Sequence, residues 1–469
     1  MNRLLRIGFC FQSFLFILSL MAINAWGSTR GEIWTQPKLL AVSAIAAFNV
    51  IYLLFYIRSG LHFPRIDRHW RLQIGCWLAF LSIGLISTLN SPFPIRSLWG
   101  QATMGDGLVY WGLMAIFTLS NAGLLAIEPR FFRYQLYGLL AGGGLTALSI
   151  VPQLLDWRID YTVTTGQISD FNPQMLESAI WQWQMPIGFY SNRGHVAFVL
   201  AATGILALLA LFKYWLRPKP CLVICVMASM ALLCTRNRAG VLAFSVAALY
   251  LLWQFWGRSK LSARSRRYLL LGLCTAVTCG AVGLTFFTPI LERLQALIAD
   301  GSLERFSTGR LYLWSLCTKG FLARPLFGWG FNGFGISQLF TADWVGTHVK
   351  YLDRGVEIAR VTGLNDFTFD YLGVDGADRI GMLITNKAHN FFLDTLISVG
   401  IFGLVVYTLA ITAPCILARQ TRLHGIEAIV LAYFVYTLTW YETAQFSHLA
   451  WWALSAVLAY SQDSTQNHG

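Results

Sequence analysis

The chain of 469 residues is 56% hydrophobic and only 12% charged. Its mean hydropathy is +0.55, whereas soluble globular proteins carry about 25% charged residues. This composition excludes an ordinary soluble domain and indicates one integral membrane domain. The formal net charge of +13 needs an explanation that fits a membrane protein.

A helix that crosses a membrane needs roughly 20 mostly apolar residues, and the sequence contains about twelve such segments. They lie near residues 8–26, 38–57, 70–88, 107–127, 134–154, 194–212, 221–235, 238–256, 268–289, 390–418, 426–440 and 445–461. We therefore expect an all-α polytopic membrane protein with about twelve transmembrane helices. No small-residue cleavage site follows the first segment, so we interpret it as a retained helix and not as a removed signal peptide.

The distribution of basic residues predicts the orientation. With twelve spans, the segments on the side of the two termini hold eighteen Lys and Arg, and the short segments on the other side hold seven. The positive-inside rule then places both termini in the cytoplasm. The excess positive charge lies mainly in cytoplasmic loops, where it favours contact with anionic membrane lipid and gives no reason to expect nucleic acid.

This orientation divides the chain into three parts. Residues 1–289 hold nine transmembrane helices, and residues 390–469 hold the last three. Between them, residues 290–389 form one large extracytoplasmic loop with ten basic and ten acidic residues, in which we expect short helices. A second outer segment near residues 155–193 contains Trp181 and Trp183, which we interpret as interfacial aromatics, with carbohydrate stacking as the alternative.

Neither cysteines nor acidic residues form a metal-binding pattern in the sequence. Eight of the nine cysteines lie in or at the ends of apolar segments, and Cys317 has no partner in the outer loop, so packing is the expected role. The acidic pairs in residues 366–370 and 375–378 are interpreted as turn and surface residues or as acceptor contacts. Because His195 and His348 lack ligand spacing to other candidates, we expect no metal and no cofactor.

Four arginines on the predicted outer side carry more information. Arg236 and Arg238 lie in a tight turn between two apolar segments, and Arg193 lies at the outer start of another. Arg310 is expected on a short amphipathic helix that also presents Trp314, four residues later. Guanidinium groups match phosphate oxygens in a bidentate way, so a lipid-linked diphosphate at the headgroup plane is the expected ligand. The alternative is that these side chains only snorkel to the lipid headgroups.

His389 lies at the outer N-terminus of the tenth apolar segment. The dipole of that helix disfavours the imidazolium, so the ring is expected to be neutral near pH 7, as a general base requires. Asn390 would orient an acceptor or cap the helix. A solvated cap residue is the other interpretation of His389.

Five short patterns together resemble one family. They are Arg310-x3-Trp314, Pro325-Leu326-x-Gly328-x-Gly330, His389-Asn390, Thr235-x-x-Arg238-Ala239 and Asn192-x3-Val196-Ala197. Their order and spacing are similar to those of the O-antigen ligase and polymerase superfamily of bacterial envelope glycosyltransferases. The resemblance covers roughly residues 190–440, whereas the first five segments match only in their hydropathy.

The resemblance implies a multi-pass enzyme of the bacterial inner membrane whose active site faces the periplasm. Such an enzyme transfers a glycan from undecaprenyl diphosphate to an acceptor hydroxyl without a metal. Carried over by position, Arg238 and Arg310 would hold the diphosphate and His389 would activate the acceptor. We add Arg193 and Arg236 as further diphosphate ligands. The expected supporting residues are Asn390, Trp314, Lys387 and Asn192.

Several readings of the function stay open at this point. Ligase, polymerase and O-linked protein glycosylase differ in whether the acceptor is a lipid, a glycan or a protein, and no local pattern decides among them. A transporter or flippase, including a role in inorganic carbon uptake, is the alternative from another class. Transporters bury ionisable residues at mid-span and on broken helices, whereas Asp394, Glu427 and Glu442 lie near the ends of apolar segments. A noncatalytic scaffold would leave the outer arginines unexplained.

Overall fold

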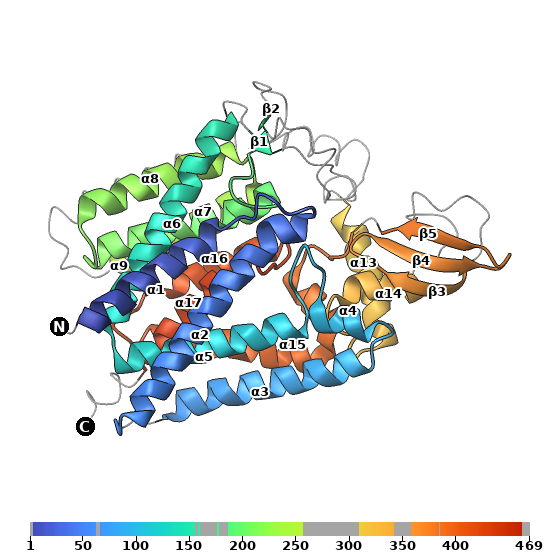
Figure 1. The fold of residues 1–469 in the computed structure, drawn as a ribbon, viewed down its shortest axis with the longest axis horizontal. Coiled ribbons are helices and arrows are strands. Elements are labelled where there is room, and N and C mark those ends of the chain that lie inside the picture. The colour runs from blue at the N-terminus through green and yellow to red at the C-terminus, as the bar shows by residue number, and fades with distance from the viewer. Residues whose placement is uncertain are drawn as a thin grey trace.

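The computed structural model describes residues 3–61, 66–154, 158–159, 176–177, 186–256, 309–341, 358–383 and 385–461. Figure 1 shows long helices packed side by side, with a small sheet at one end next to two short helices, α13 and α14. The helices are α1 (Arg3–Met21), the π-helix η1 (Gly31–Thr35), α2 (Gln36–Arg58), α3 (Arg68–Leu89), α4 (Pro94–Trp99), α5 (Leu108–Ile127), α6 (Arg130–Leu154), α7 (Arg193–Phe212), α8 (Pro218–Cys234), α9 (Arg238–Trp256), α13 (Arg310–Ala323), α14 (Gly333–Thr341), α15 (Phe391–Ala418), α16 (Glu427–Thr437) and α17 (His448–Ala459).

Within the described residues, seven helical segments are long and apolar enough to cross a membrane. They are Gly31–Arg58, Arg68–Leu89, Leu108–Ile127, Arg130–Leu154, Arg193–Phe212, Arg238–Phe255 and Phe391–Ala418. The shorter apolar helices α1, α8, α16 and α17 coincide with four further predicted segments. The predicted segment at 268–289 lies outside the described residues, so the total of twelve spans stays a prediction.

Small residues bring the helices of this domain close together. A Cβ atom at Gly138 on α6 would lie 2.4 Å from the carbonyl oxygen of Ser13 on α1, and one at Gly143 would lie 2.1 Å from the hydroxyl of Thr203 on α7. Neither position can hold a larger side chain without moving the neighbouring helix. Glycine at helix contacts is the usual way for membrane helices to gain dispersion contacts.

Helix α15 is broken at Gly400, which has φ 68° and ψ −172°. Residues 325–330, the glycine-rich run, pair with the opened backbone. Trp329 and Gly330 donate their backbone N–H groups to the carbonyls of Ile397 and Ser398, both at 2.9 Å, and Ile401 donates to Pro325 at 2.9 Å. The break is therefore hydrogen-bonded by protein, as a non-helical backbone within a membrane domain requires.

The predicted outer loop contains the short helices α13 and α14, but the expectation of an all-α fold is wrong there. An antiparallel sheet forms from β3 (Ile358–Leu364), β4 (Thr368–Gly373) and β5 (Asp378–Met382) in that order. Alternate residues of β4 are buried, and Phe369 and Tyr371 pack with Leu339 and Leu383. This two-residue period is typical of a strand with one covered face. A second, two-stranded sheet consists of β1 (Arg158–Ile159) and β2 (Leu176–Glu177).

The interpretation of residues 375–378 as a turn is confirmed for Asp375, which lies in the turn between β4 and β5, but Asp378 is the first residue of β5. Residues 366–370 are a turn only in part. Asp370 lies within β4, and Asp366 precedes the strand and forms an ion pair with Arg96 at 2.8 Å. The side chains of Trp181 and Trp183, like His348, lie outside the described residues.

Candidate active site

His389 lies in the short connection between β5 and α15. Its backbone has φ 53°, and its half-buried ring stands edge-on to Trp440 at 5.5 Å and to Tyr441 at 4.9 Å between centroids. The buried Nδ1 atom has no hydrogen-bond partner among the described residues. A ring in this position can accept a proton once a hydroxyl reaches it.

Burial and, as the smaller cause, the positive charge of Arg310 together lower the pKa of His389 to about 4. The imidazole is therefore neutral at pH 7, as the sequence analysis predicted. The cause differs from the expected one, because removal from water dominates and a neighbouring cation adds to it.

Arg310 begins α13 directly after Gly309, whose φ is 77°. The charge of Arg310 acts on His389, and Trp314 on the same helix donates its indole N–H to the carbonyl of Ala388 at 3.1 Å. Both residues of the Arg310-x3-Trp314 pattern therefore meet the segment that carries His389. The structure brings the two predicted catalytic residues together.

Arg193 and Arg236 form a second cationic pair, close enough for their positive charges to repel each other. Arg193 begins α7, and Asn192 before it caps the helix by accepting the N–H of Gly194 at 2.8 Å. Arg236 has φ 52° in the turn between α8 and α9. Arg238 begins α9 two residues later, with an exposed side chain.

Trp440 connects the second cationic pair to His389. A Cβ atom at Gly194 would lie 2.5 Å from the Trp440 indole, so the start of α7 packs directly against this ring. The other neighbours of Trp440 include His389 and, in a stacked arrangement at 5.3 Å, Tyr441. The N-terminal ends of α7 and α15 thus meet at the connection between α16 and α17.

Sequence reasoning missed Trp440 and Tyr441, and it did not single out Arg30. The charge of Arg30, just before η1, acts on His195 and Tyr441, which adds a cation to the same region. Trp440 and Tyr441 lie between two apolar segments, where interfacial aromatics are common. Their only signal was their position on the predicted outer side.

Two residues predicted to support the site have structural roles. Asn390 caps α15 by accepting the N–H of Leu393 at 3.2 Å, and its amide donates to the carbonyl of Leu438 at 3.3 Å. Of the two predicted roles, the cap is the one observed. Lys387 is buried and forms an ion pair with Asp106, so it does not reach out toward a ligand.

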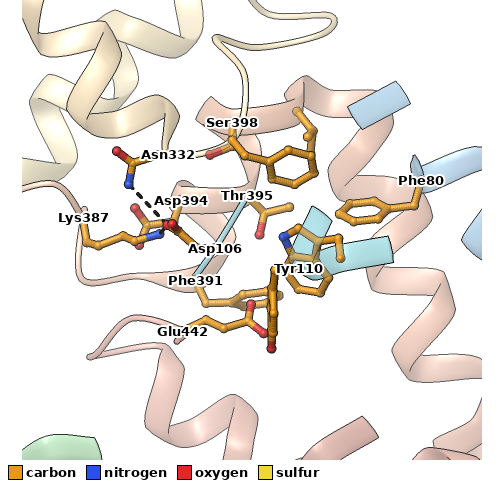
Figure 2. Close-up of a pocket in the computed structure, with 13 residues that line it drawn as sticks. Phe80, Asp106, Tyr110, Asn332, Lys387, Phe391, Asp394, Thr395, Ser398 and Glu442 are labelled. Atoms are coloured by element: carbon orange, nitrogen blue, oxygen red, sulfur yellow. Dashed lines mark hydrogen bonds and ion pairs between the residues drawn. The ribbon is translucent and has the colours of Figure 1, made fainter. Parts of the chain in front are cut away.

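Lys387 and Asp106 line a pocket whose other polar residues include Asn332, Asp394 and Glu442 (Figure 2). Burial disfavours the charged forms of both Lys387 and Asp106. The nearby carboxylates nevertheless raise the pKa of Lys387 above its usual value. Lys387 and Arg96 together lower the pKa of Asp106 despite burial. Burial raises the pKa of Glu442 to about 8. At pH 7 the pair is charged, whereas Glu442 is neutral.

Among the described residues, no group of three His, Cys, Asp or Glu side chains could hold a metal ion. The acidic residues of the outer loop instead include partners of arginines, such as Asp366 with Arg96 at 2.8 Å and Asp375 with Arg379 at 2.6 Å. The arrangement around His389 thus offers a neutral base and several cations. A neutral base beside cations is an arrangement that suits deprotonation of a nucleophile next to an anion.

Comparison with known proteins finds one family match within the chain. Residues 221–358 match the model of the O-antigen ligase family, and this region contains Arg236, Arg238, Arg310 and Trp314 but neither Arg193 nor His389. No curated protein matches the chain. The match over residues 221–358 supports the resemblance of the chain to the O-antigen ligase superfamily.

Proposed function

We propose that this protein transfers a glycan from undecaprenyl diphosphate to an acceptor hydroxyl at the extracytoplasmic face of the bacterial inner membrane. The observation that carries the proposal is a half-buried, neutral His389 that the charge of Arg310 influences, in a segment hydrogen-bonded to Trp314 of the helix that Arg310 begins. A neutral imidazole can take the proton of a hydroxyl nucleophile. A cation beside it can stabilise the negative charge that develops on a diphosphate leaving group. The reaction needs neither a metal nor a cofactor.

In this reaction the acceptor hydroxyl oxygen attacks the anomeric carbon of the donor sugar. His389 takes the hydroxyl proton as the new C–O bond forms. The bond from the anomeric carbon to the diphosphate oxygen breaks, and its electron pair stays on undecaprenyl diphosphate. Arg310, with Arg193, Arg236 and Arg238 from the membrane domain, would stabilise the charge on those oxygens through charge-assisted hydrogen bonds.

The acceptor is the hydroxyl of a glycan, of a lipid-linked core or of a protein side chain. The same donor chemistry serves polymerase, ligase and protein glycosylase, because they differ only in the partner bound opposite His389. We favour an envelope polysaccharide polymerase or ligase.

Replacement of His389 or Arg310 by Ala in the native host tests this function. Both variants should abolish high-molecular-weight surface polysaccharide while the protein stays in the membrane. The matched control is His424→Ala, because His424 lies beside Lys213 in a predicted cytoplasmic loop and should tolerate the change. Normal polysaccharide in the His389→Ala strain would refute the proposal.

One pair of observations favours a transporter as the second candidate. The broken helix α15 and the buried Asp106, Lys387 and Glu442 are features that transporters use to bind and move ions. Neither the break in α15 nor the nearly complete burial of these three ionisable side chains was expected from the sequence. Uptake of a labelled substrate by purified protein in liposomes, without any glycosyl transfer, would favour this candidate.

A further inference from the structure

The backbone that carries His389 is anchored on both sides of the imidazole. Before it, Lys387 pairs with Asp106, and Ala388 donates its N–H to Asp394 at 2.8 Å. The carbonyl of Ala388 accepts the indole N–H of Trp314 at 3.1 Å. After His389, the cap of α15 by Asn390 fixes the start of that helix.

Asp106 is itself held in place by groups from two other parts of the chain. Its Oδ1 accepts the backbone N–H of Gln101 at 2.8 Å, and its Oδ2 accepts the side-chain amide of Asn332 at 3.3 Å. Nε of Arg96 on α4 donates to Oδ1 of Asn332 at 3.3 Å. The ion pair thus ties the His389 segment to a framework made by the segment before α5 and by the start of α14 (Figure 2).

The ion pair is almost completely removed from water. The side chains of Lys387 and Asp106 are 10% and 7% exposed, and apolar residues of the same pocket include Phe80, Trp111 and Phe391. A buried pair is a weak source of net stability, because desolvation offsets the attraction, but loss of one partner leaves an uncompensated charge. Such a pair is best suited to fixing one geometry.

His389 needs this fixation because its backbone lies in the left-handed region at φ 53°. A residue with a Cβ atom leaves that region unless its surroundings hold it there. A relaxed backbone would move the ring away from Trp440, Tyr441 and the charge of Arg310.

We infer that the buried Lys387–Asp106 ion pair, together with the Trp314–Ala388 hydrogen bond, is a positioning device for His389. The inference rests on the proposed function of His389 as the base. Lys387, Asp106 and Trp314 are positioning residues in this account: they act through the backbone and touch neither donor nor acceptor. Their loss should lower the rate of the chemical step without weakening the binding of the lipid-linked donor.

The test uses full-length protein in liposomes with an undecaprenyl-diphosphate-linked glycan, and it measures kcat and the KM for this donor. Asp106→Asn and Lys387→Met should each lower kcat about 10- to 100-fold, as displacement of a catalytic group by about 1 Å does, with the donor KM within about twofold. The double variant should be no worse than the single variants, because the two changes remove one shared interaction. Arg379→Gln, which removes the exposed Arg379–Asp375 pair of the sheet, is the control and should leave both constants unchanged.

Trp314→Phe is a second test that can be used if the Asp106→Asn and Lys387→Met proteins do not accumulate in the membrane. It keeps an aromatic ring and removes a single hydrogen bond, and it should lower kcat about fivefold. An unchanged kcat in folded Asp106→Asn or Trp314→Phe protein would overturn the inference. So would a lower total activity that is fully explained by a smaller amount of folded protein. If these variants and His389→Ala were all fully active, the proposed function itself would be wrong. If these variants were fully active but His389→Ala were inactive, only the inferred positioning role would be wrong.

Discussion

At the scale of single residues, the site depends on an imidazole that stays neutral in water-poor surroundings. The depressed pKa of His389 has two causes, burial first and the charge of Arg310 second. An unperturbed histidine becomes protonated below about pH 6.5. Since the pKa of His389 in the folded protein is about 4, its imidazole should stay neutral at pH values where an exposed histidine is already protonated.

The pH dependence of glycosyl transfer follows from this shift. As the pH falls from 7, the rate at saturating substrate should stay constant past 6.5 and decline only as the pH approaches about 4, because protonation of His389 removes the base. Initial rates over this range measure the decline, with donor binding over the same range as the control. A decline centred at pH 6.5 or above would mean that His389 is solvated or is not the base.

Some of these residues could be identified from the sequence and others could not. His389 and Arg310 stand out because polar groups at the ends of apolar segments need a reason to be there. Asp106 does not stand out, because its partner is 281 positions away along the chain and one acidic residue in an outer turn has many ordinary explanations. Trp440 was hidden by the abundance of aromatics at membrane interfaces.

At the scale of elements, α15 begins two residues after His389 and is broken at Gly400. Hydropathy predicted one continuous helix over residues 390–418, and it could not show the break because glycine is common in transmembrane helices. The glycine-rich run at 325–330 was noted as a motif, but its role as the partner of that break needs the three-dimensional contacts. The sheet was missed for a similar reason, since its strands are short and only β4 alternates clearly.

Gly400 should therefore be the most sensitive glycine of α15. A Cβ atom there would lie 2.1 Å from the carbonyl oxygen of Leu326, in a backbone with φ 68°. Gly400→Ala should cost on the order of 2–5 kcal/mol of stability, from the left-handed backbone and from overlap. Chemical unfolding of the purified protein in detergent measures this loss.

Gly60 is the matched control for that substitution. Its φ is 74°, but an added Cβ atom meets nothing within 4 Å, so Gly60→Ala should cost only about 1–2 kcal/mol. Equal losses in the two variants would show that the contact with residues 325–330 contributes nothing.

At the scale of the whole molecule, the site is assembled from parts that lie far apart along the chain. Arg193, Arg236, Arg310 and His389 each lie at or next to the start of a different helix or in the turn before it. The sequence predicts that they share one side of the membrane, because alternating spans would place all of these helix ends there. It could not predict the packing of Gly194 against Trp440, which depends on how α7 meets the connection between α16 and α17.

The central claim is that this molecule forms a glycosidic bond with His389 as the base. The most direct measurement is product analysis after purified protein in liposomes meets an undecaprenyl-diphosphate-linked glycan and a candidate acceptor. We expect a lengthened or transferred glycan with release of undecaprenyl diphosphate, and a rate about 10²- to 10⁴-fold lower in His389→Ala. A full yield of product from His389→Ala, or movement of substrate across the membrane with no new bond, would contradict this claim.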